Sequence, residues 1–123
     1  MTMLRCVRVV GDRPPEDVMV ESSLEGIKGA IGLTEDDDIH GVMARISDVV
    51  YILYHDDRGR LKGLPATVID PFGRSYLVGP VLVAKYDGVD GEVSMTEADV
   101  AAVMDRIVCF SDGTRYLYLE AGA

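Results

Sequence analysis

Several residue types are scarce in this chain of 123 residues, and each scarcity narrows the range of functions. The chain has no tryptophan and only 7% aromatic residues, which argues against a sheet that stacks the bases of single-stranded nucleic acid. Twelve Lys and Arg against 21 Asp and Glu give a formal net charge of −9, which disfavours binding to nucleic-acid phosphates. Solubility is the favoured explanation of this acidity, and docking onto a basic partner is the alternative.

Long apolar segments are missing as well. No run approaches the roughly 20 residues of a membrane-spanning helix, so we expect no contact with a membrane. The first residues, MTMLRCVRVVGD, lack the sustained apolar segment of a signal peptide. We therefore expect a cytoplasmic protein.

Cysteine and histidine occur only twice each, which limits the catalytic chemistry that the chain can carry. Cys6 and Cys109 each lie in an apolar run, so we expect two buried, reduced side chains rather than a disulfide. Neither His40 nor His55 has a Ser or Cys nucleophile in a recognisable local context. The chain has no nucleotide-binding glycine motif, and DGVDGE at residues 87–92 lacks the spacing of an EF-hand loop. We expect a binding protein without a cofactor rather than an enzyme.

Length and patterning predict one compact α+β domain over residues 1–123, with a mainly antiparallel sheet of about five strands and two helices. Residues 49–54 (VVYILY) form a continuous apolar run and predict a central strand that is buried on both faces. Residues 3–10 alternate between apolar and basic side chains and predict a half-buried strand. The other predicted strands are residues 39–47, 76–85 and 115–119.

Residues 22–31 carry the signals of the first helix. Ser22 and Glu25 match a capping box, apolar residues follow at helical spacing, and Gly32 is a natural stop. Gly26 and Gly29 weaken this helix, so it must depend on tertiary packing, and two glycines also indicate close approach to a neighbouring element. The second helix is predicted to begin after Ser94 or Thr96, and its apolar face is formed by Val100, Val103, Met104 and Ile107.

At two breaks in the apolar pattern, the sequence fits more than one backbone conformation. Ser47 and Asp48 separate two predicted strands, and either a tight turn or a bulge fits them. Gly79 and Pro80 interrupt residues 76–85, where the proline predicts a bulge or an edge position.

The stretch DDRGRLKGLPAT, residues 56–67, contains the main candidate for a binding site. Arg58, Arg60 and Lys62 fall within five positions, and in an extended chain they would share one face. Together with Gly63 they could hold the carboxylate or phosphate of an anionic ligand. They could equally neutralise the surrounding aspartates, and this second interpretation is favoured because exposed ion pairs are common.

The two histidines form a less favoured candidate for a metal site. If the strands on either side of residues 47–48 pair as a hairpin, His40 and His55 meet across the strands beside several aspartates. Imidazole and carboxylate groups in that arrangement could ligate a divalent metal ion. Two solvated strand ends are the favoured alternative.

Five motifs follow one another along the chain: VVGDRPP, SSLEGIKGAIG, DDRGRLKGLPA, YLVGPVLVAK and SMTEADVAAVMDRI. In this order they resemble the domain-of-unknown-function family 3846, whose members occur in bacteria, phages and mobile elements. The resemblance covers roughly residues 3–108. One departure lies after Gly-Leu-Pro, where Ala66 and Thr67 replace the asparagine and arginine that many family members carry.

The resemblance implies a small accessory protein of phage or mobile-element origin and brings no established activity. We therefore expect a non-enzymatic module that binds a host or element-encoded protein, with an anion-binding loop as the alternative. A homo-oligomer is a further option, because residues 115–119 could pair as an edge strand across a two-fold axis.

Overall fold

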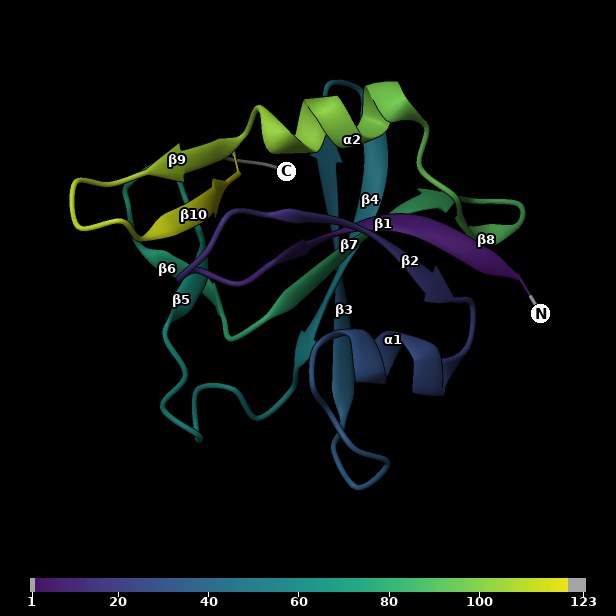
Figure 1. Ribbon diagram of the computed structural model, residues 1–123, viewed down its shortest axis with the longest axis horizontal. Coiled ribbons are helices and arrows are strands. Elements are labelled where there is room, and N and C mark those ends of the chain that lie inside the picture. Colours follow the sequence, from purple (N-terminus) through teal and green to yellow (C-terminus); the bar gives the residue numbers. More distant parts are fainter. Residues whose placement is uncertain (1, 120–123) are drawn as a thin grey trace.

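The computed structural model describes residues 2–119, and this part of the chain contains ten strands and two helices (Figure 1). The elements in chain order are β1 (Met3–Val9), β2 (Glu16–Glu21), α1 (Leu24–Ala30), β3 (Ile39–Ile46), β4 (Val49–Asp56), β5 (Ala66–Ile69), β6 (Ser75–Val78), β7 (Val81–Asp87), β8 (Gly91–Val93), α2 (Glu97–Met104), β9 (Ile107–Cys109) and β10 (Arg115–Tyr118).

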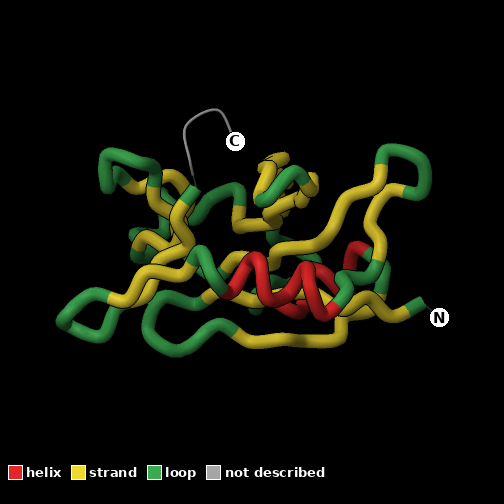
Figure 2. The backbone as a smooth tube through the Cα atoms, turned by 90° about the horizontal axis from the view of Figure 1, so that it is seen from above, coloured by secondary structure: helices red, strands yellow, loops and turns green. Residues whose placement is uncertain are grey.

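The strands form two sheets. The first sheet is antiparallel, has the order β2-β1-β7-β4-β3, and carries β8 on β7. The second has the order β6-β5-β10-β9, and within it β5 and β10 run parallel. In both views the second sheet lies at the end of the molecule opposite the N-terminus (Figures 1 and 2).

The predicted combination of two helices with a mainly antiparallel sheet is confirmed, but the expected five strands in one sheet are wrong. Four strands were missed because they are three to six residues long, too short for an alternating pattern to stand out: β2, β5, β8 and β9. Residues 76–85, predicted as one strand, contain two strands that belong to different sheets.

Gly79 and Pro80 mark the point where the chain passes from the second sheet to the first. Gly79 has a φ of +75°, which favours glycine, and its N–H donates to the carbonyl of Pro65 at 2.8 Å. A Cβ at Gly79 would also lie 2.7 Å from Leu64 Cδ1. The predicted bulge or edge is therefore corrected to a strand break, because the proline withholds a hydrogen bond at a position outside both ladders.

The β3–β4 hairpin turns at Ser47 and Asp48, whose φ values of 51° and 65° are both positive. Ile46 pairs with Val49, so the connection is a two-residue turn of the I′ type and not a bulge. This register determines which side chains face each other at the other end of the hairpin.

Both helices have side-chain N-caps. Ser23, one residue beyond the predicted cap, accepts a hydrogen bond from the Gly26 N–H at 3.0 Å, and Gly32 follows α1 with a φ of +76°. Thr96 and Asp99 form a complete capping box at α2. Ile107, predicted on the face of this helix, instead begins β9.

Two apolar clusters cover the two faces of the first sheet. One lies between this sheet and α1, and the other lies between the first sheet, α2 and the second sheet. The predicted burial of β4 on both faces is confirmed, although the central strand is β7. The half-buried prediction for β1 is wrong, because Cys6 packs in the first cluster and Val7 in the second.

Two further predictions are corrected at the second sheet. β10 lies between β5 and β9, so it is not an edge strand and cannot pair across a two-fold axis as expected. Cys109 is exposed on the edge strand β9, whereas Cys6 is buried as predicted, and both cysteines are free.

Candidate functional site

Residues 57–65, which connect β4 to β5, fold into consecutive turns. The N–H of Lys62 donates to the carbonyl of Arg58 at 3.0 Å, and the N–H of Gly63 donates to that of Arg60 at 3.1 Å. Gly63 has a φ of +71°, a conformation that favours glycine. The extended chain that would align three cations on one face does not form, and the three side chains have different surroundings.

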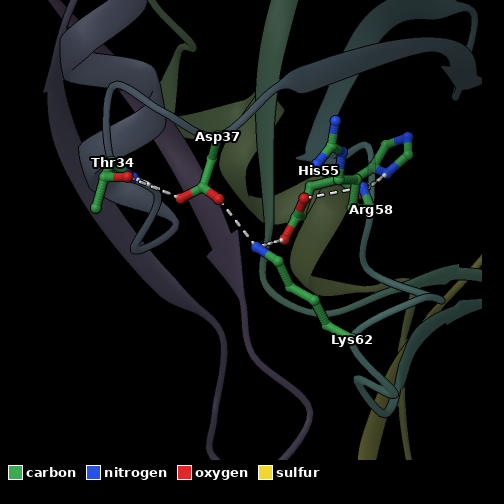
Figure 3. A network of polar contacts seen from close by, with 6 residues as sticks. Thr34, Asp37, His55, Arg58 and Lys62 are labelled. Carbon is green, nitrogen blue, oxygen red and sulfur yellow. Dashed lines mark hydrogen bonds and ion pairs between the residues drawn. The ribbon is translucent and has the colours of Figure 1, made fainter.

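Lys62 lies between two carboxylates (Figure 3). Its Nζ is 2.6 Å from Asp56 Oδ2 and 3.1 Å from Asp37 Oδ1. Asp56 is only 4% exposed, and its other oxygen accepts the N–H of Arg58 at 2.9 Å. Hydrogen bonds from the Thr34 backbone and from Lys62 lower the pKa of Asp37 to about 2. Lys62 therefore neutralises neighbouring aspartates, which is the second of the two interpretations of the sequence.

The two arginines of the loop differ from each other. Arg60 Nη2 donates to the backbone carbonyls of Ser75 and Tyr76, each at 3.1 Å, and so attaches the loop to β6. The Arg58 side chain is exposed, and within residues 2–119 its guanidinium makes no hydrogen bond or ion pair.

His40 and His55 pair across the β3–β4 hairpin, which is the arrangement that the less favoured metal-site interpretation required. Their ring centroids are 5.3 Å apart, with the planes at 74°. His55 Nδ1 lies 3.1 Å from the carbonyl oxygen of Asp56, whereas its buried Nε2 has no partner among the described residues. In the described part of the chain, no group of three or more His, Cys, Asp and Glu side chains is arranged to hold a metal ion.

Burial is the main cause that lowers the pKa of His55, and the nearby His40 acts in the same direction. The Asp56 carbonyl and the charges of Asp57 and Asp56 oppose this shift. The neutral form of His55 is therefore favoured in the folded protein.

A second polar network, around Asp99, has a structural role. The Asp99 carboxylate accepts the N–H of Thr96 at 2.8 Å and lies 3.0 Å from Lys85 Nζ. The Tyr51 hydroxyl donates to it at 3.5 Å, and burial and the Asp99 charge raise the pKa of Tyr51 to about 12. These contacts fix the start of α2 against the first sheet.

The outer surface of the second sheet exposes apolar side chains that sequence reasoning did not bring together. Leu77, Leu117 and Ile107 contact the core between the sheets, so their strand neighbours Tyr76, Tyr116 and Val108 face outward. Val108 pairs with Tyr116, and the Phe110 ring lies 5.1 Å from that of Tyr116. We call Tyr76, Val108, Phe110 and Tyr116 the aromatic face; the first three are 42%, 37% and 48% exposed.

The sequence predicted only some of the strands that carry the aromatic face. Residues 115–119 were predicted as a strand, and that strand forms as β10. The flanking strand β9 was not predicted, since it has only three residues and follows α2 almost directly. Without β9, Val108 and Phe110 could not be placed beside Tyr116.

Charge is distributed unevenly between the two sheets. Residues 57–80 and 105–119, which contain the second sheet, hold six of the 12 Lys and Arg but only four of the 21 Asp and Glu. The acidic excess of the chain therefore lies on the first sheet and its loops, and the aromatic face lies in the more basic part.

Comparison of the chain with models of known families, with curated proteins and with solved structures finds no match. The resemblance to family 3846 stays a prediction. Over residues 2–119, no helix has the length and apolar character needed to cross a membrane.

Proposed function

We propose that this chain is a small acidic accessory protein, a non-enzymatic module that binds another protein through the aromatic face. The observation that carries the proposal is the pairing of exposed Val108 with Tyr116 and the contact of Phe110 with the same ring. Single exposed apolar side chains are common on soluble proteins, whereas adjacent ones on one sheet face mark interaction sites. Aromatic side chains are also enriched in protein interfaces.

The partner that fits this face is a protein segment with apolar side chains and flanking Asp or Glu residues. The surroundings of the aromatic face carry an excess of positive charge, including Arg60, which donates hydrogen bonds to backbone carbonyls of β6. The net charge of −9 would repel such a segment at long range. Exposed charges are screened beyond about 8 Å at physiological salt, so the local charges decide the preference.

The origin and the partner's source are proposed on the resemblance to family 3846 alone. That resemblance implies a protein of a phage or mobile element that acts on a host protein or on a protein of the same element. Genes of phage or mobile-element type beside the coding sequence would support this origin, and housekeeping genes on both sides would contradict it.

A peptide selection tests the function even while the partner is unidentified. A random peptide library is displayed and selected on the wild-type protein. We expect enriched peptides to combine apolar residues with Asp or Glu. Failure to enrich any sequence, or enrichment of Lys- and Arg-rich peptides, would contradict the proposal.

A second candidate function is the binding of a small anionic ligand by Arg58, Arg60, Lys62 and Gly63. The exposed guanidinium of Arg58 favours it, whereas the internal contacts of Arg60 and Lys62 oppose it. A ligand at a hundred times its Kd adds about 2.7 kcal/mol to the free energy of unfolding. A thermal-shift panel of nucleotides and phosphorylated metabolites separates the two functions: a stabilising ligand whose effect disappears in Arg58→Gln supports the anion site.

A further inference from the structure

A cavity of about 240 Å³ lies on the α1 side of the first sheet. The residues before and within α1, the first residue of β3, and one residue each of β4 and β8 line it: Ser22, Ser23, Leu24, Ile27, Ile39, Tyr54 and Glu92. Pockets that enclose whole drug-sized ligands measure roughly 300–1,000 Å³. This cavity therefore suits a smaller group, such as one side chain.

The carboxylate in the cavity belongs to Glu92, and within residues 2–119 it has no basic partner in an ion pair. The Tyr54 hydroxyl donates to Glu92 Oε1, and no Lys, Arg or His of the described residues forms an ion pair with Glu92. None of the described residues that line the cavity is basic. The charge of Glu92 is felt nearby, since it adds to burial in raising the pKa of Cys6 to about 12. By contrast, six carboxylates elsewhere in the described chain have a basic partner: Glu16, Asp17, Asp37, Asp56, Asp70 and Asp99.

The rest of the cavity wall is largely apolar. Leu24 beside it is 59% exposed, and Ile27 and Ile39 contribute aliphatic surface. A cation on an aliphatic stem matches this combination, because its methylene groups can lie along apolar walls while its charge meets the carboxylate. A Tyr ring also attracts cations to its face.

We propose that this cavity binds an alkylammonium group, the chemistry of a lysine side chain or of a free diamine. The ammonium group has three N–H donors, for which the Glu92 carboxylate and the Ser22 hydroxyl offer acceptors. The site lies on the acidic first sheet, away from the aromatic face of the second sheet. This second binding activity goes beyond the proposed function and does not depend on it.

The test is a titration of the ¹⁵N-labelled full chain followed by amide chemical shifts. The probes are Nα-acetyl-lysine methylamide and cadaverine, which represent the two sources of the group. We expect saturable shifts at residues 22–27 with at least one probe, and a Kd on the order of millimolar. Glu92→Gln keeps the shape of the side chain and removes its charge, so the Kd should rise about tenfold or more.

Two controls and one further variant test whether binding depends on the charge and the walls of the cavity. Nα-acetyl-norleucine methylamide, which lacks the charge, should give no saturable shift. Asp48→Asn removes one exposed charge at the far end of the β3–β4 hairpin and should leave the Kd within twofold. Leu24→Ala shortens an exposed side chain at the cavity rim, should fold normally, and should weaken binding several-fold.

The proposal is overturned if neither probe gives saturable shifts, if Glu92→Gln binds like the wild type, or if Asp48→Asn loses as much affinity as Glu92→Gln. The Phe110→Ser variant, which should lose peptide binding, should bind the alkylammonium probes like the wild type. The failure of one proposal is therefore distinguishable from the failure of the other.

Discussion

At Lys62, one ammonium group connects two loops that are 25 residues apart in the sequence. Two carboxylates, one of them buried, share this cation. One member of the basic cluster Arg58, Arg60 and Lys62 therefore stabilises the fold through internal ion pairs. A count of basic residues in a turn cannot distinguish a ligand site from internal ion pairing, because the difference depends on which aspartates the fold brings near.

The Asp37 carboxylate makes folding stability depend on pH. Its pKa is lowered from 3.8 to about 2 by the Thr34 backbone and Lys62, so ionised Asp37 favours the folded state. Its contribution is complete above about pH 4 and is lost as the pH falls towards 2. Asp37→Asn should therefore show a shallower loss of stability than the wild type in urea unfolding between pH 5 and pH 2. Equal slopes for the two proteins would contradict this assignment.

The histidine pair should be visible in an NMR titration. The lowered pKa of His55 means that its neutral form favours folding, so its contribution to stability is lost as the pH falls through 6.5 and below. We expect the His55 ring signals to titrate below the ordinary value of 6.5. His40→Ala removes the neighbouring positive charge and part of the burial, so the pKa of His55 should rise. A fall, or no change, would contradict the assignment of His40 as a group that lowers the pKa of His55.

At the scale of elements, α1 shows how two identical residues can have different roles. A Cβ at Gly26 would lie 2.4 Å from the carbonyl oxygen of Glu21, whereas a Cβ at Gly29 would meet no described atom within 4 Å. The predicted close approach to a neighbouring element is thus confirmed for Gly26 and wrong for Gly29.

The two glycines form a matched pair for mutation. Gly26→Ala should lower the free energy of unfolding by about 1–3 kcal/mol, because the helix must move away from β2. Gly29→Ala should raise it by up to about 1 kcal/mol, because alanine is the better helix former in open space. Chemical denaturation of both variants measures the difference, and equal effects of the two substitutions would contradict the packing.

The sequence predicted those elements that have a clear local pattern of their own residues. The strands β3 and β4 and the capped α2 were predicted from alternation, β-branched residues and Thr96. β2 and β9 pair with their neighbours in the chain, β1 and β10, but were missed because six and three residues are too few for an alternating pattern to stand out. Gly79 and Pro80 carried a clear break signal, but only the fold shows that the break joins two sheets.

At the scale of the whole molecule, the site was less predictable than the fold. The meeting of His40 and His55 followed from hairpin register, which sequence can supply. The cavity at Glu92 and the aromatic face combine residues from three or more separate elements, and no local pattern joins them. The charge asymmetry also became visible only once the residues were assigned to two sheets.

The most direct test of the proposed function is the affinity of a selected peptide for three proteins, measured by isothermal titration calorimetry. The proteins are the wild type, Phe110→Ser, and Val89→Ser, which removes a 91% exposed side chain in the turn between β7 and β8. Loss of a central aromatic contact typically costs about 2 kcal/mol or more, so the Kd for Phe110→Ser should rise at least tenfold. Val89→Ser should bind like the wild type. Equal affinities for the wild type and Phe110→Ser, or an equal loss in both variants, would contradict a docking role for the aromatic face.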